Sequence, residues 1–224
     1  MIVNPYVFAS GGVQYPQVRA IAKSSFSTGS SSNWALPSYS AGDMLIAMVA
    51  HRSTSVTLTL PSGWTLLANL AQSTNIRGSI YWKIADGSEG STIPVTSSSS
   101  AVLAIIIASI KGGTFSPTIP PAVSQIGLLT DAPDPPSLTP EDGSGKYLVI
   151  AEFSARSDMP VSTYPYAGGD YIISSGTTGI SGTATTQAVC FGTFDAASID
   201  PGAFTSTVTN RGLVASTIAI KAAA

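Results

Sequence analysis

The sequence predicts an all-β protein, an antiparallel β-sandwich or jelly-roll-like fold with two pseudo-repeated halves. Helical periodicity is absent from almost every window. Short runs rich in Val, Ile, Thr and aromatic residues recur instead, separated by clusters of Gly, Pro and Ser. A chain of 224 residues is long enough for one large sandwich or two small fused ones.

About a dozen segments have the character of strands. They cover residues 17–24, 44–50, 55–60, 64–70, 78–84, 92–96 and 101–110, and after a gap residues 146–155, 169–174, 184–194, 203–209 and 213–220. Val56, Leu58 and Leu60 alternate with threonines, as in a strand with one face in water. Segments 44–50 and 101–110 are apolar on both faces, so we expect them to be central strands.

The chain divides into an N-terminal arm, two β-rich halves and a connector. We place the arm at residues 1–16, the first half at 17–112, the connector at 113–144 and the second half at 145–224. Seven prolines mark the connector. Because proline interrupts both β-ladders and helices, this stretch is predicted to join the halves.

The two halves share an order of motifs. The matched segments are 42–47 with 145–150, 60–67 with 164–173, 79–84 with 188–193, and 105–111 with 215–221. This alignment places Met44 opposite Tyr147, and each half ends on an apolar strand followed by a lysine. The pattern indicates an internal duplication, with chance convergence as the alternative. The halves would form either two stacked lobes or the two facing sheets of one sandwich.

A succession of short motifs also carries a family resemblance. The motifs are 37–47, 60–67, 81–85 and 108–111 in the first half, and 134–140, 200–204 and 216–221 in the second. In this succession the chain resembles a family of phage and prophage structural proteins. The resemblance covers nearly the whole chain beyond residue 16, but its motifs are turns and strand ends. It implies the context of a virion and no catalytic residue. We expect a structural protein that decorates the capsid or associates with the tail, without a cofactor.

The N-terminal arm has no place in the duplicated plan. It is apolar and aromatic, with Tyr6, Phe8 and Tyr15 among its residues, and prolines and glycines interrupt it. Such an extension needs a covering partner, so we expect an arm that docks on other virion proteins or on further copies of the chain. The symmetry of phage-like particles favours a homo-oligomer, with a trimer as the natural arrangement. The alternative is an arm that adds an edge strand to its own sheet.

Composition excludes several classes of partner. With 10 basic against 12 acidic residues and no basic run, the chain has no positive field for nucleic acid. The longest apolar run, 101–110, is about half the ~20 residues of a membrane helix, so no membrane insertion is expected. The first eight residues lack the basic and apolar regions of a secretory signal, which favours assembly in a host cytoplasm.

Residues that carry chemistry are scarce. His51 is the only histidine and is predicted to lie at a surface or strand end, whereas Cys190 is predicted to be a buried, inert thiol. Glu152 is the one acid well inside a strand, where we expect it to face solvent or to be paired. The acidic turns 86–89 and 141–143 offer at most a single calcium site, and 143–146 is a turn rather than a phosphate loop. We therefore predict no catalytic, cofactor-binding or metal site.

Aromatic residues are the remaining candidates for a binding site. Tyr164, Tyr166 and Tyr171 gather on one Gly/Pro-rich segment, where they would serve as interface anchors or stack on sugar rings. Trp64 follows a Pro-x-Gly turn and would close the end of the sandwich or stack on a ligand, whereas Trp82 is predicted to be core. The alternative function is therefore a carbohydrate-binding adhesin that recognises a host-surface glycan. A polysaccharide hydrolase, with Glu152 as the residue to test, is a more remote alternative.

Overall fold

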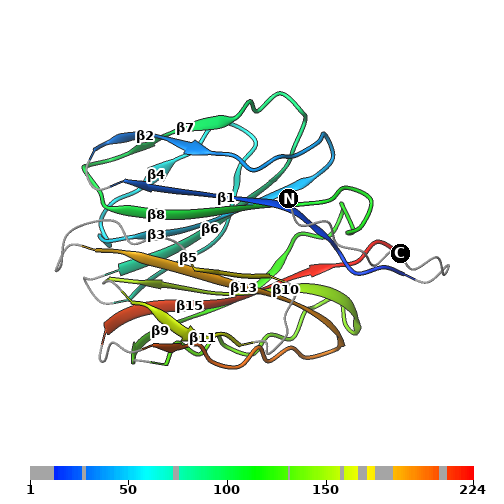
Figure 1. Cartoon of the computed structure of the whole chain (residues 1–224). Helices are drawn as coiled ribbons and strands as arrows, with labels where there is room; N and C mark the ends of the chain where they lie inside the picture. Colours follow the sequence, from blue (N-terminus) through cyan, green and yellow to red (C-terminus); the bar gives the residue numbers. More distant parts are fainter. Residues whose placement is uncertain are drawn as a thin grey trace.

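The computed structural model describes residues 13–26, 29–72, 76–130, 132–156, 159–165, 171–174, 184–206 and 211–224, without the side chains of 171–174 and 211. This part of the chain is all-β, and every strand pairing in it is antiparallel. The strands stack in layers (Figure 1). The predicted all-β class with antiparallel sheets is confirmed.

The first half contributes a five-stranded sheet in the order β1-β8-β3-β6-β5. Its strands are β1 (Val18–Phe26), β3 (Met44–His51), β5 (Thr65–Gln72), β6 (Ile76–Ile84) and β8 (Leu103–Ile110). Every residue of β3 and β8 is buried, and neither strand lies at an edge. The prediction that segments 44–50 and 101–110 form central strands is therefore confirmed.

The second half contributes a five-stranded sheet in the order β12-β13-β10-β15-β9. Its strands are β9 (Ala122–Thr130), β10 (Gly145–Ala155), β12 (Tyr171–Ser174), β13 (Thr186–Ala196) and β15 (Arg211–Lys221). β10 lies at the centre, between β13 and β15. It is the counterpart of β3, which lies between β6 and β8.

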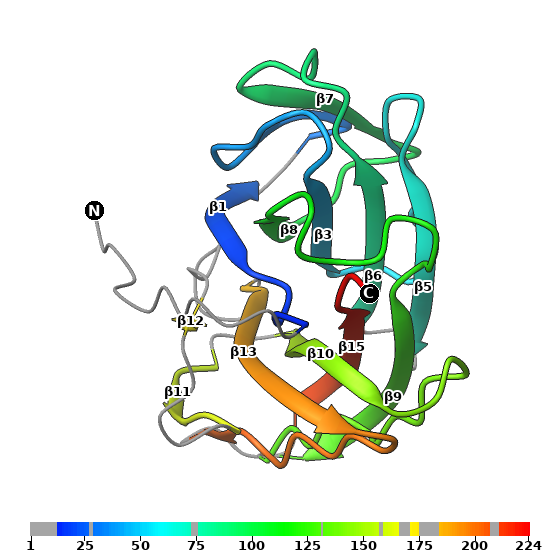
Figure 2. The same cartoon turned by 90° about the vertical axis from the view of Figure 1, so that its right-hand side faces the viewer.

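The two sheets pack face to face and share one apolar core, which we call the central core (Figure 2). Side chains on one face of a strand alternate with those on the other. Met44, Ile46 and Met48 of β3 therefore enter this core together, opposite Leu148 and Ile150 of β10. Of the two arrangements that the sequence left open, the structure has the single central sandwich.

Smaller sheets and loops cover the outer faces. β2 (Ser31–Ala35), β4 (Leu58–Thr59) and β7 (Thr92–Ser97) form a three-stranded sheet over the first five-stranded sheet, with Trp34 fully buried beneath it. β11 (Val161–Thr163) and β14 (Thr205–Ser206) form a two-stranded sheet beside the outer face of the second, where Phe204 packs on Phe153. This double cover explains why every residue of β3, and β10 from Tyr147 to Ala155, is buried.

The predicted connector 113–144 is corrected, because it contains the nine-residue edge strand β9. The prolines of the connector flank residues 122–130 without interrupting them, so this stretch keeps every backbone N–H for pairing with β15. Other boundaries also differ from the prediction. β4 and β14 are two residues long, whereas longer strands were expected at 55–60 and 203–209, and β2 and β11 were not predicted.

The two five-stranded sheets have the same connectivity. Replacing β1, β3, β5, β6 and β8 by β9, β10, β12, β13 and β15 converts one sheet order into the other. The sequence alignment of Met44 with Tyr147 is nevertheless wrong, because Met44 faces the central core and Tyr147 the outer side of the second sheet.

If β10 is shifted by one residue relative to β3, the alignment of the two halves agrees with the strand pairing in the two sheets. Ile46 pairs with Trp82 and Ala108, and the corresponding Ile150 pairs with Phe191 and Ile218. In this register Trp82 corresponds to Phe191, as the sequence alignment required. The shared order is what a duplication would leave, and the duplication itself stays a prediction.

Candidate functional site

Residues 13–17 lie at the end of the sandwich that also holds the C-terminus, and we call them the arm root. The Lys146 ammonium donates to the Val13 carbonyl at 2.7 Å and lies 5.2 Å from the centre of the Tyr15 ring. The Gln17 N–H donates to Thr114 Oγ1, and the Gln17 carbonyl accepts from Lys111 N. The arm root is thus attached to both halves of the fold.

Of the three predicted docking residues, only Tyr15 belongs to the arm root. Tyr15 is half-buried and in contact with Lys146. Tyr6 and Phe8 lie outside the described residues. Residues 13–17 are not part of a strand, and β1 begins at Val18. The alternative that the arm adds an edge strand concerns residues 1–12, which also lie outside the described residues.

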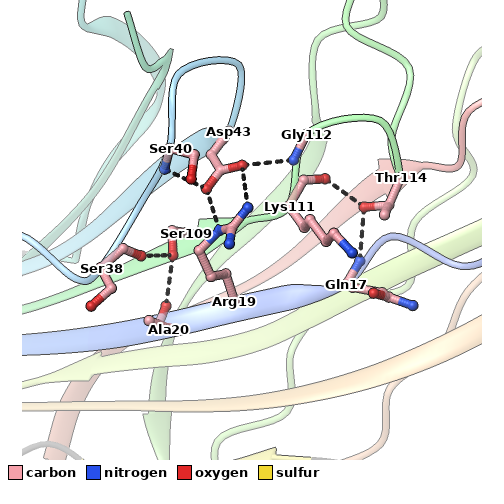
Figure 3. A network of polar contacts seen from close by, with 10 residues as sticks. All are labelled: Gln17, Arg19, Ala20, Ser38, Ser40, Asp43, Ser109, Lys111, Gly112 and Thr114. Carbon is pink, nitrogen blue, oxygen red and sulfur yellow. Dashed lines mark hydrogen bonds and ion pairs between the residues drawn. The ribbon is translucent and has the colours of Figure 1, made fainter. Parts of the chain in front are cut away.

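A polar network beside the arm root is centred on Asp43 (Figure 3). The Asp43 carboxylate is 1% exposed and accepts from Arg19 Nε at 2.5 Å and Arg19 Nη2 at 3.2 Å. The backbone N–H groups of Gly112 and Ser40 donate to it at 2.8 and 2.9 Å. Burial by itself raises the pKa of Asp43, but these hydrogen bonds and the Arg19 charge lower it below its ordinary value. This carboxylate ties β1, the turn before β3 and the turn after β8 together.

Lysines neutralise the two acidic turns that were considered for calcium. Lys83 Nζ lies 2.7 Å from Glu89 Oε1 and 3.7 Å from Asp86 Oδ2. In the second half, Lys221 Nζ lies 2.9 Å from Asp142 Oδ2 and donates to the Asp142 carbonyl at 2.8 Å. An ammonium group thus occupies the cation position in each turn. Within the described residues, no group of three or more His, Cys, Asp or Glu is placed to hold a metal ion.

His51 lies at the end of β3 as predicted, but it is buried rather than on the surface. Its Nε2 lies 3.0 Å from Ser79 Oγ, and Ser79 donates to Asn69 Oδ1 at 3.1 Å. Burial, with a smaller contribution from Arg77, lowers the pKa of His51 to about 4, so the ring is neutral at pH 7. Because Ser79 is 1% exposed, this Ser–His pair cannot contact a substrate in the described conformation.

Glu152 is also buried, at 1% exposure, so the solvent-facing alternative is wrong. Gln187 Nε2 donates to its Oε2 at 2.5 Å, and the Ser216 hydroxyl donates to its Oε1. Burial raises the pKa of Glu152, the hydrogen bonds from Ser216, Gln187 and Ser154 lower it, and the result is a pKa of about 7. A carboxyl enclosed in this way has no access to a polysaccharide.

The aromatic candidates are mostly engaged in packing. Tyr164 packs against Phe204, with ring centroids 6.0 Å apart in an edge arrangement. Trp64 is partly buried against the core beneath the three-stranded sheet, and Trp82 is partly buried against the central core, less completely than predicted. Tyr166 and the side chain of Tyr171 lie outside the described residues. A site formed by the three tyrosines together therefore stays a prediction.

Sequence reasoning missed several residues that organise these regions, namely Arg19, Asp43, Lys146, Gln187 and Ser216. The Gly-Asp pair directly before an apolar strand was the one available signal for Asp43. Cys190 is buried, as predicted. No helix in the described part of the chain has the length and apolar character that crossing a membrane requires.

No family model, curated protein or solved structure matches this chain.

Proposed function

We propose that the chain is a non-enzymatic structural protein of a bacteriophage-like virion, a capsid-decoration or tail-associated subunit that acts through protein–protein contacts. The arm root is the observation that carries the proposal. Twelve residues, including Tyr6 and Phe8, precede a segment that Lys146, Thr114 and Lys111 attach to both halves of the sandwich. An apolar segment that leaves such a fixed point is suited to docking on a neighbouring subunit.

The chemistry of the described residues supports a structural function. Asp43 and Glu152 are enclosed by hydrogen-bond partners, and lysines neutralise Asp86, Glu89 and Asp142. A catalytic acid or base has to reach the substrate proton that it transfers. These carboxylates instead support the packing and the turns.

Virion membership is tested directly by mass spectrometry of phage particles purified from cells that encode the chain. The proposal expects its peptides at a stoichiometry that fits the symmetry of the head or tail. Particles that form normally and lack these peptides would overturn the proposal. Glycan-array binding by the purified chain without release of reducing sugar would select the adhesin instead.

The docking arm is tested by removing residues 2–12, which leaves the arm root intact. We expect the shortened chain to lose self-association, or binding to purified particles, with an unchanged melting temperature. A full-length chain with Tyr6→Ser and Phe8→Ser is the matched control, because it removes the aromatic side chains without shortening the arm. This variant should lose the same binding. A melting temperature that falls on truncation of a monomer would instead mean that the arm belongs to its own sheet.

A further inference from the structure

A polar layer lies between the two five-stranded sheets, next to the central core. Along the inward face of β10, the apolar Leu148 and Ile150 are followed by Glu152 and Ser154. A Cβ added to Gly78 of β6 would lie 3.4 Å from Ser154 Oγ, so this polar face meets the opposite sheet at close range. Glu152 is therefore enclosed between the halves of the fold.

We propose that Glu152 is a pH-responsive element of the sandwich: it is protonated in the folded protein at mildly acidic pH, and its ionisation as the pH rises destabilises the packing of the two sheets. The proposal is independent of the virion function. It requires that the carboxyl be buried, that no cation neutralise it, and that its neighbours accommodate both protonation states.

The groups that touch the carboxyl are neutral. Gln187 reaches it from β13 and Ser216 from β15, and Gln125 of β9 donates to Ser216 Oγ at 3.0 Å. Ser154 Oγ donates to Gln187 Oε1 at 2.7 Å and completes the network. No Lys or Arg forms an ion pair with Glu152 among the ion pairs of the described residues.

Charged groups occur further along this end of the sandwich. The opposite sheet presents Ala50 of β3, Ile76 and Gly78 of β6 and Leu70 of β5 to the layer, none of which titrates. Arg52 follows the end of β3, and Arg156 follows the end of β10. Burial lowers the pKa of Arg52, and the nearby charge of Arg156 lowers it further. Arg156 is four residues beyond Glu152, about 13 Å along an extended strand.

Lys23 of β1 pairs with Ile106 at the edge of the first sheet and is exposed. Among the described residues, His51 and Arg77 are two further titratable or charged groups near this end. Side chains alternate along a strand, so both lie on the outer face of the first sheet, away from the layer. His51 contacts Ser79 there, and Arg77 donates to the Thr54 carbonyl. Neither group therefore offers Glu152 a counter-charge.

The hydrogen-bond network suits both forms of the carboxyl. When Glu152 is ionised, the Ser216 hydroxyl and the Gln187 amide both donate to it. When it is protonated, its O–H can donate to Ser216 Oγ after the hydroxyl rotates, because a serine oxygen both donates and accepts. Protonation therefore needs no rearrangement of the backbone.

The sign of the pH dependence follows from the pKa. Burial raises the pKa of Glu152 from 4.5 to about 7, so the folded chain binds one more proton than the unfolded chain between these values. The stability that this group contributes is fully present below about pH 4.5 and is lost as the pH rises through about 7. In this window the unfolding equilibrium constant should rise close to tenfold per pH unit.

The test is urea unfolding of the full chain from pH 5 to 9, with Glu152→Gln and Glu141→Gln as variants. Glu141 is exposed on a turn, so its substitution makes the same charge change without touching the layer. We expect the wild type and E141Q to share the rise in the unfolding constant, and E152Q to lack it. Identical profiles for all three proteins would overturn the proposal.

Infrared spectroscopy of the wild-type chain provides a test even if E152Q does not fold. The carbonyl stretch of a protonated carboxylic acid should be present at pH 5.5, where exposed carboxyls are ionised, and absent at pH 9. A spectrum without this band at pH 5.5 would contradict the proposal.

Discussion

Asp43 and Glu152 are both 1% exposed, yet the fold treats the two carboxyl groups in opposite ways. Asp43 has an arginine and two backbone N–H donors, and its pKa is lowered despite burial. Glu152 has only side-chain donors and no cation, and its pKa is raised to about 7. Burial is thus common to both carboxyls, and the donors decide which form is stable.

Position in the strand explains the difference in donors. Asp43 directly precedes β3, where the N–H groups of Ser40 and Gly112 belong to turns and are free to bind a carboxylate. Glu152 lies inside β10, which pairs with β13 and β15 on its two sides. Since the ladders use the backbone donors there, only neighbouring side chains can reach the carboxyl.

The largest effect is expected for Asp43→Ala. It leaves the Arg19 guanidinium and the N–H groups of Ser40 and Gly112 without their acceptor, at a cost of about 3–5 kcal/mol in the free energy of unfolding. Urea unfolding at pH 7 measures this cost. Asp200→Ala, at an exposed position, is the control and should stay within about 0.5 kcal/mol of the wild type. A loss below about 1 kcal/mol for Asp43→Ala would show that the network is not structural.

A smaller difference in stability is expected between substitutions of two glycines, Gly112 next to Asp43 and Gly78 next to Ser154 of the polar layer. A Cβ at Gly112 would lie 2.8 Å from the Gly42 carbonyl oxygen, and one at Gly78 would lie 3.0 Å from Val214 Cγ1. Backbone atoms shift less easily than side-chain atoms. We therefore expect Gly112→Ala to lower the free energy of unfolding by about 2–3 kcal/mol and Gly78→Ala by about 1–2 kcal/mol. Thermal unfolding of both variants checks this order. The reverse order would mean that the turn after β8 moves more easily than β15.

The smallest effect is expected for Ser216→Ala. The variant removes one donor to Glu152, and about 1 kcal/mol of stability at pH 7 should be lost with it. Because this hydrogen bond lowers the pKa of Glu152, its loss should move the titration of the carboxyl to higher pH. Ser144→Ala on an exposed turn is the control. An unchanged titration midpoint in Ser216→Ala would contradict the assigned hydrogen bond.

The all-β class was predicted from short apolar runs separated by clusters of Gly, Pro and Ser. The central position of β3 and β8 was predicted because both runs are apolar on both faces. Both features can be seen in a short stretch of sequence. The register between the halves was wrong by one residue, and a shift of one residue reverses which side chains of a strand face inward. β9 was not predicted, because the prolines on both sides of it indicated a connector without strands.

The buried polar residues could not be predicted because their partners are distant in sequence. Asp43 meets Gly112 across 69 positions, and Glu152 meets Ser216 across 64. Trp34 was likewise missed, although it is fully buried, because it lies on the short β2. A single acidic residue in a sequence pattern does not reveal which donors the fold will bring to it.

The most direct test of this account is a carbon-13 NMR titration of the side-chain carboxyl carbons in the wild-type chain. Asp43 should titrate below its ordinary value of 3.8 and Glu152 near pH 7. Asp43 would then lose its stabilising contribution as the pH falls through its lowered pKa, and Glu152 as the pH rises through 7. Midpoints near 4 for both carboxyls would contradict the account, because they would mean that neither burial nor the assigned donors control their ionisation.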